Sequence, residues 1–242
     1  MIISNNILKE SYSTYANKNA KISREMKNGN IIKIINGLYE TDSYTPGHYL
    51  ATSIYGPSYL SFDFALSCYG KIPEKVTTYT SATFDKKKKK EYRNQFGCFT
   101  YRDVPTEVYP LGVCAMKENG YTYQIATAEK ALCDKLYTIS PLKNYKELKN
   151  LLFEDLRIDI EEFNKLNVEE IKIISELYHS TNVDMLYRFM RRYSNRIISL
   201  YQELKKELSF LKFDNYVNLC YNMRVTWQKP IIYAVRERIG EK

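Results

Sequence analysis

The sequence predicts an α+β protein in which an N-terminal winged helix-turn-helix is followed by a mixed α/β domain with a mainly helical C-terminal part. Two helical patterns and a β-prone hairpin follow one another at the start of the chain. Strand-like segments separated by turn signals come next, and apolar residues at steps of three and four dominate the remainder. We expect the boundaries 1–45 for the winged helix, 46–140 for the α/β part and 141–242 for the helical part.

The N-terminal region has the order helix, helix, hairpin. Residues 4–14 open with Ser4, a good N-cap, and carry the apolar positions of one short helix, Ile7, Leu8 and Tyr12. Residues 17–28 form a second helical pattern, and Gly29 stands where a C-cap glycine belongs. The β-prone segment that follows contains Asn36-Gly37, a strong signal for a tight turn between two strands.

The polar face of the second helix is suited to DNA. An α-helix fits the major groove, and side chains in its first turns reach the base edges. The side chains that we expect to contact DNA are Asn17, Lys18, Asn19, Lys21, Arg24 and Lys27 on this helix and Lys33 and Asn36 on the hairpin. The alternative is an ordinary solvated helix face followed by a hairpin, and composition alone does not separate the two interpretations.

The region 46–140 alternates helices and strands. The expected elements are a helix that Ser61 caps and Gly70 ends, strands at 76–83, 96–102, 107–113 and 121–125, and a helix that starts at Thr127 and buries Ala131, Leu132 and Leu136. Between the first two strands stand Lys86, Lys87, Lys88, Lys89 and Lys90, which must lie in a solvent loop, expected at a hairpin tip. This loop contacts DNA phosphates or an acidic partner, or it only keeps the chain soluble.

The region 141–242 is predicted to be mainly helical. The expected helices cover 142–153, 160–166 and 167–178, with Asn167 as N-cap and Glu170 in the capping-box place. A longer apolar seam starts at residues 181–182 and runs to Leu211. Away from it lie four arginines, Arg188, Arg191, Arg192 and Arg196. They form a secondary basic patch for DNA backbone or an acidic partner, or they pair with the acidic stretch 154–176.

Charge and composition narrow the class of protein. The chain of 242 residues carries a formal net charge of +8. Residues 141–178 have a negative net charge, whereas 1–45, 46–140 and 179–242 are each positive. This distribution is typical of a protein that meets a polyanion with part of its surface. No stretch approaches the roughly 18 apolar residues of a membrane span, and the N-terminus lacks a secretory signal. We therefore expect a cytoplasmic protein with no membrane partner.

The residue types of metal and catalytic sites are scattered along the chain. The five cysteines are not spaced as a zinc knuckle or a disulfide framework. His48 and His179 lie outside any catalytic motif, so we interpret them as surface or partly buried imidazoles. Glu129 and Lys130 are adjacent and lie in a predicted helix. Nuclease chemistry needs an acidic residue followed by Glu-x-Lys on a strand, which together hold a metal ion and activate water. We expect no enzyme activity, no catalytic residues, no metal and no cofactor.

Several motifs occur together in the order of one protein family. They are YANKNAKISREMKNGNIIKIINGLYET, GPSYLSFDFALSCYGKIPEKVTTYTSAT, FGCFTYRDVP and YQIATAEKALCDKLY. Through this combination, residues 12–138 resemble the AbiEi-type antitoxins of type IV toxin–antitoxin (abortive infection) systems. The resemblance is loose beyond residue 140.

The resemblance implies a function and two partners. The winged helix would bind inverted repeats in the double-stranded DNA of its own promoter and repress the operon. The larger C-terminal part would counteract a nucleotidyltransferase-like toxin without a stable complex. The alternatives are a stand-alone winged-helix regulator of a phage-defence locus and an enzyme that acts on nucleic acid. For the enzyme, the residues offer neither a paired-aspartate nucleotidyltransferase signature nor a Walker glycine loop.

Overall fold

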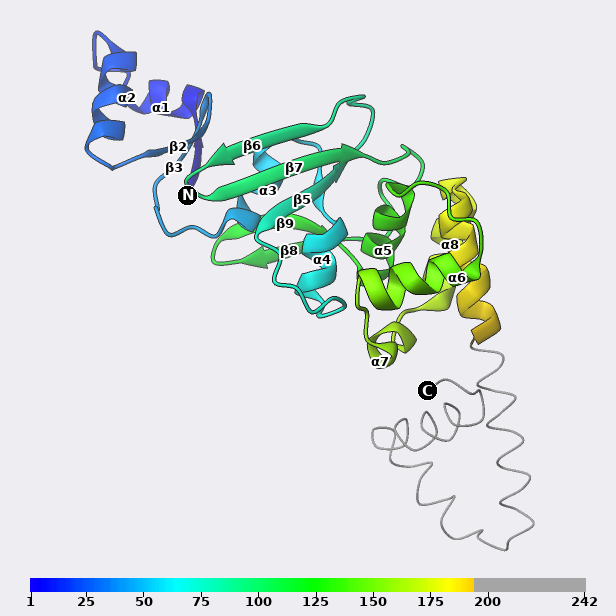
Figure 1. The fold of residues 1–242 in the computed structure, drawn as a ribbon. Helices are drawn as coiled ribbons and strands as arrows, with labels where there is room; N and C mark the ends of the chain where they lie inside the picture. Colours follow the sequence, from blue (N-terminus) through cyan, green and yellow to red (C-terminus); the bar gives the residue numbers. More distant parts are fainter. Residues whose placement is uncertain (194–242) are drawn as a thin grey trace, which may run out of the picture. The chain divides into compact units, whose positions relative to one another are not determined.

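The structure, a computed structural model, describes residues 1–193 (Figure 1). Its contacts divide the chain into two compact units, Met1–Tyr187 and Arg188–Lys242. The first unit is a mixed α+β fold that contains two sheets. Arg196 and the part of the apolar seam beyond Tyr193 lie outside the described residues. No helix within residues 1–193 is both long and apolar enough to cross a membrane.

The N-terminal elements are β1 (Ile2–Ser4), α1 (Asn5–Ser11), α2 (Lys18–Lys27), β2 (Ile32–Ile35) and β3 (Leu38–Glu40). The three strands form an antiparallel sheet in the order β1-β3-β2. Ser4 caps α1 as expected, Asn17 caps α2, and Gly29 and Gly37 adopt the left-handed backbone that their positions require. A small core of Leu8, Ile22, Ile31 and Tyr39 joins the helices to the sheet.

Two details of this region differ from the sequence prediction. The strand β1 was not predicted, because three residues are too short for a periodic pattern, and its pairing with β3 joins distant parts of the chain. Ile7, counted among the apolar positions of the first helix, is 54% exposed. Only Leu8 of α1 is buried, so this helix contributes a narrow contact to the core.

The second sheet has six strands in the order β6-β7-β5-β4-β9-β8. The elements of this region are a 3-10 turn (Gly47–Tyr49), α3 (Ala51–Ile54), β4 (Tyr59–Leu60), α4 (Phe62–Cys68), β5 (Thr78–Thr83), β6 (Lys90–Asn94), β7 (Gly97–Asp103), β8 (Val113–Glu118), β9 (Tyr121–Ala126) and α5 (Ala128–Tyr137). Helices α4 and α5 pack against each other and against the central strands. Thr127 caps α5, and Ala131, Leu132 and Leu136 are fully buried, as predicted.

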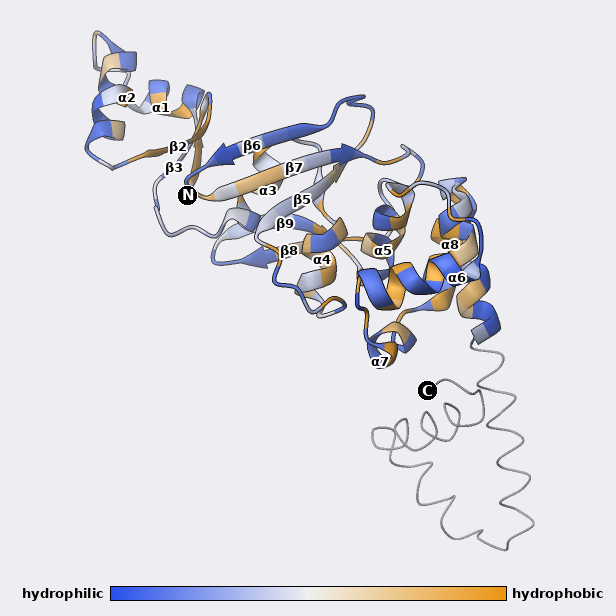
Figure 2. Ribbon diagram, in the orientation of Figure 1, coloured by the Kyte–Doolittle hydropathy of each residue, from blue (hydrophilic) through white to orange (hydrophobic). Residues whose placement is uncertain are grey.

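The prediction of a hairpin around the lysine run is wrong. Strands β5 and β7 pair in parallel, so no hairpin joins them, and β6 pairs antiparallel with β7 instead. Residues 86–89 connect β5 to β6, and Lys90 begins β6. This edge strand is hydrophilic along its length (Figure 2). Of its residues, only Tyr92 and Asn94 are partly buried, and the others are exposed. It therefore lacks the apolar alternation that identifies a strand in a sequence.

Two further expectations for this region are corrected. No strand covers residues 107–112, which form turns where Pro110 lacks an N–H and Gly112 has a φ of +60°. Ser61 precedes α4 but makes no capping bond, because its hydroxyl donates to Asp134. The Asn119-Gly120 turn joins β8 to β9, as predicted.

The described C-terminal elements are helical, as expected, with different bounds. They are α6 (Tyr145–Lys149), a π-helical turn (Asn150–Asp155), α7 (Ile160–Asn164) and α8 (Val168–Tyr178), followed by helical residues 181–193. Asn167 caps α8, but Glu170 does not complete a capping box. Its carboxylate accepts a bond from Thr127 at 2.6 Å, while Glu129 accepts from the Asn167 N–H at 2.7 Å. These two contacts join the starts of α5 and α8.

A buried ion pair lies where β4, α4, α5 and α8 meet. Lys130 and Asp134 are 2.9 Å apart, and both side chains are completely buried. Asp134 also accepts hydrogen bonds from Tyr59 at 3.0 Å, Ser61 at 2.5 Å and Tyr178. Burial raises the pKa of the Tyr59 and Tyr178 hydroxyls, so both remain donors at neutral pH. Asp134 is therefore fully partnered although it has no contact with water.

Replacing Asp134→Asn tests this arrangement. The change leaves the Lys130 ammonium buried without a counter-charge, so we expect the free energy of unfolding to fall by about 3–5 kcal/mol in urea denaturation. Asp63→Asn is the control, because Asp63 and Lys135 pair at 2.7 Å with side chains 32% and 24% exposed. We expect the control to lose less than about 1 kcal/mol. Similar small losses in both variants would contradict the structural role of the buried pair.

Candidate nucleic-acid interface

Helix α2 presents most of its polar side chains to solvent. Asn17, Asn19, Arg24 and Lys27 are exposed, and Lys18 is partly exposed. Ile22 is the buried residue of this helix, so a single narrow stripe anchors α2 to the small core. Of the six helix residues predicted to contact DNA, five therefore lie on accessible surface. Lys21 differs from the others.

Lys21 is engaged within its own region of the protein. Its ammonium lies 2.6 Å from the Glu25 carboxylate and over the rings of Tyr12 and Tyr15, at 5.7 and 5.1 Å from their centroids. The hydrogen bond with Glu25 raises the pKa of Lys21, and the same bond lowers the pKa of Glu25. Sequence reasoning missed this pair, although a spacing of four residues on a helix signals it. Lys21 is thus a weaker candidate than Arg24 for a DNA contact.

Arg24 and Lys27 occupy the last turn of α2. Neither forms an ion pair with another residue in the range 1–193, so their charge is available to a phosphate group. These two residues are the strongest cationic contacts that α2 offers.

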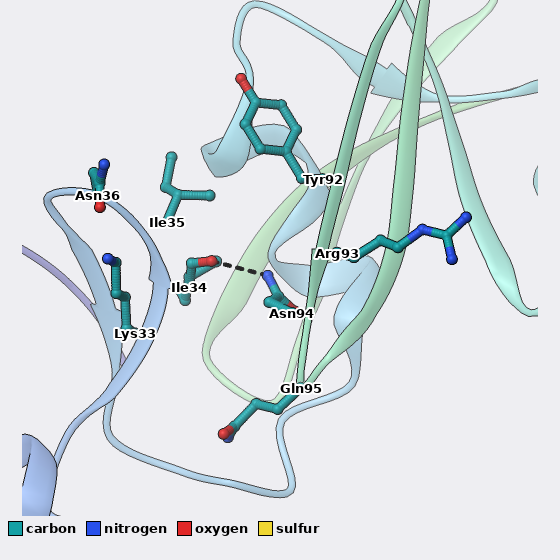
Figure 3. A pocket seen from close by; sticks show the side chains of 8 residues that line it. All are labelled: Lys33, Ile34, Ile35, Asn36, Tyr92, Arg93, Asn94 and Gln95. Carbon is teal, nitrogen blue, oxygen red and sulfur yellow. Dashed lines mark hydrogen bonds between the residues drawn. The ribbon is translucent and has the colours of Figure 1, made fainter.

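The hairpin residues Lys33 and Asn36 lie beside a cleft of about 620 Å³. The cleft separates the β2–β3 hairpin from the end of β6, and its lining is Lys33, Ile34, Ile35, Asn36, Tyr92, Arg93, Asn94 and Gln95. Figure 3 shows Asn94 reaching across to the hairpin, where its amide donates to the Ile34 carbonyl at 3.0 Å, while Arg93 extends away from the hairpin. Lys33 and Asn36 are both exposed, so both are accessible to a ligand.

The secondary basic patch separates into two groups. Lys87, Lys88 and Lys89 lie together beside Arg102, which sequence reasoning did not include. Lys86 places its ammonium 5.4 Å from the centroid of the Tyr55 ring. Arg188, Arg191 and Arg192 are exposed on the helical residues 181–193 and belong to the second compact unit. Each of these three arginines has an interaction partner.

The residues with catalytic side chains do not form a site in residues 1–193. His48 is partly buried among Tyr49, Phe64, Tyr79 and Tyr123, and burial lowers its pKa. His179 is exposed at the end of α8. Lys130 and Asp134 have no exposed surface with which to touch a substrate. Within this range no three His, Cys, Asp or Glu side chains are grouped to hold a metal ion, and the four cysteines are free.

The chain matches no protein-family model and no curated protein.

Asn17 caps α2 and is also a predicted DNA contact. A measurement of protein stability tests the capping role separately from DNA binding. The Asn17 carboxamide oxygen accepts from the Ala20 N–H at 3.0 Å. We expect Asn17→Ala to lower the free energy of unfolding by about 1 kcal/mol, because it leaves this N–H unpaired. Asn17→Asp keeps the acceptor and adds a charge that the helix N-terminus favours, so its stability should match the wild type. Urea denaturation measures both, and an unchanged Asn17→Ala variant would contradict the cap.

Proposed function

We propose that the protein is a DNA-binding antitoxin of the AbiEi type, whose N-terminal region is a winged helix that binds and represses its own promoter. The order of elements supports this proposal. Helices α1 and α2 form a helix-turn-helix pair, the β2–β3 hairpin is the wing, and β1 completes a three-stranded sheet. In this arrangement α2 corresponds to the helix that enters the major groove.

The observation that carries the proposal is the exposed polar face of α2. Asn17 and Asn19 offer amide groups at the start of the helix, where base edges are reached, and amides of this kind pair with adenine. Arg24 and Lys27, which form no ion pair within residues 1–193, supply cations for phosphates, and Lys33 extends the same charge onto the hairpin. Base contacts specify a sequence, whereas phosphate contacts position the protein and make its affinity sensitive to salt.

The antitoxin role rests on the resemblance of residues 12–138 to AbiEi-type chains. We propose that residues beyond 45 counteract a nucleotidyltransferase-like toxin without a stable complex, and that the chain itself performs no chemistry. A stand-alone winged-helix regulator of a phage-defence locus is the second candidate, since the α2 surface serves it equally well. A nucleotidyltransferase-like reading frame next to this gene, whose toxicity the protein relieves on co-expression, would favour the antitoxin.

A gel retardation assay tests the DNA-binding proposal. The double variant Arg24→Ala/Lys27→Ala should lose retardation of a duplex taken from upstream of its own gene, with an unchanged helical circular dichroism signal. Each lost phosphate contact should reduce the slope of log affinity against log salt by about 0.9. Lys21→Ala should have a smaller effect than Arg24→Ala, because Lys21 is already paired with Glu25.

The matched control is Lys117→Ala/Lys146→Ala, which removes the same charge from two exposed lysines outside the N-terminal region. The control should retain nearly all of the retardation. Equal retardation by Arg24→Ala/Lys27→Ala and by the control would remove α2 from the DNA-contacting role.

A further inference from the structure

A second basic site lies at the start of β6, whereas the cleft beside the β2–β3 hairpin lies at the other end of this strand. It is a hollow of about 330 Å³. Three elements line it: the β5–β6 loop with Lys87, Lys88 and Lys89, the end of β7 with Arg102 and Asp103, and the end of α5 with Tyr137 and Thr138. A hollow of this volume is within the range of small-ligand sites. Its lining combines four cations with one aromatic ring.

Asp103 holds the lysine loop in a fixed conformation. One carboxylate oxygen accepts the Thr83 hydroxyl at 2.5 Å, and the other accepts the backbone N–H groups of Lys86 at 2.8 Å and Lys87 at 2.5 Å. Asp85 and Lys87 have φ values of +50° and +55°, in the left-handed region that residues other than glycine rarely adopt. The loop is therefore held by specific bonds, and strain of this kind concentrates at ligand sites.

The cations around the hollow are poorly neutralised. Among the described residues, Asp103 is the one carboxylate in its lining, and its bonds are directed to the loop backbone and to Thr83. Lys87 lies 3.9 Å from Asp85, with both side chains mostly exposed, which makes a weak pair. Lys88, Lys89 and Arg102 form no ion pair with any residue in the described part of the chain. Three lysines and an arginine that line one hollow favour a multiply charged anion such as phosphate.

The opposite wall of the hollow has a different character. Tyr137 is 40% exposed, and its ring packs on Tyr178 with 5.1 Å between centroids. Tyr137 and Thr138 stand at the C-terminal end of α5, where the helix dipole disfavours a phosphate. An uncharged base can stack on an exposed aromatic ring without that penalty. The hollow therefore has a phosphate side at the loop and a base side at Tyr137.

We propose that this hollow binds a nucleotide with a polyphosphate chain, its phosphates held by Lys88, Lys89 and Arg102 and its base stacked on Tyr137. This site goes beyond the proposed DNA binding and does not depend on it. A single carboxylate of an acidic peptide carries less charge than a phosphate chain and matches the crowded cations less well. A duplex backbone keeps its bases stacked inside the helix and has no use for Tyr137.

Isothermal titration calorimetry of the full chain with ATP, GTP and tripolyphosphate tests the proposal. Lys88→Ala/Lys89→Ala should weaken binding of all three by about tenfold or more. Tyr137→Leu should weaken ATP and GTP binding but leave tripolyphosphate binding unchanged. Lys117→Ala/Lys146→Ala, which removes equal charge elsewhere, should bind all three like the wild type. Circular dichroism confirms that each variant is folded.

The same variants separate this site from the α2 surface. Arg24→Ala/Lys27→Ala should keep nucleotide binding while it loses retardation of the promoter duplex. The proposal is overturned if the wild type binds neither nucleotides nor tripolyphosphate at millimolar concentrations. It is also overturned if Lys117→Ala/Lys146→Ala weakens nucleotide binding as much as Lys88→Ala/Lys89→Ala does. Tighter binding of a single-stranded oligonucleotide than of a nucleotide at the hollow would overturn it as well.

Discussion

The carboxylate of Asp134 gathers four donors from the interior of the α/β region, and the positions of the surrounding elements depend on it. Lys130 belongs to the same helix, whereas Tyr59 comes from β4 and Tyr178 from the end of α8. Removing a charged pair from water is costly, and the cost is offset only when every polar atom finds a partner. Few other arrangements of the helices on the sheet would satisfy these groups together. The cluster also fixes Tyr178, against which the exposed Tyr137 packs.

The N-terminal region has its own small core and a different kind of anchor. Glu40 at the end of β3 is fully buried and accepts bonds from the backbone N–H groups of Thr41 at 2.8 Å and Asp42 at 3.2 Å. Its carboxylate also receives the N-terminal amine of Met1, which ties β1 to β3. This core fixes α2 by one buried residue, Ile22, and leaves Asn19, Arg24 and Lys27 exposed.

Local signals in the sequence predicted what short-range physics determines. The caps Ser4, Thr127 and Asn167 and the turns Asn36-Gly37 and Asn119-Gly120 depend on neighbouring residues, and the structure has them. The cap expected at Ser61 is absent, because that hydroxyl donates to the distant Asp134. Strand β6 was missed because an edge strand needs no apolar face. The burial of Lys130, and the meeting of Arg102 and Tyr137 with the lysine loop, depend on contacts between distant segments that periodicity cannot reveal. The exposed faces of the candidate DNA site were predicted, except that Lys21 turns to Glu25.

Amide hydrogen exchange of the full chain, measured with and without a duplex from upstream of its own gene, tests whether α2 and the β2–β3 hairpin contact duplex DNA. We expect slower exchange on binding in residues 17–36, and little change in the hairpin of β8 and β9. Slower exchange elsewhere, with residues 17–36 unaffected while the duplex is bound, would contradict it.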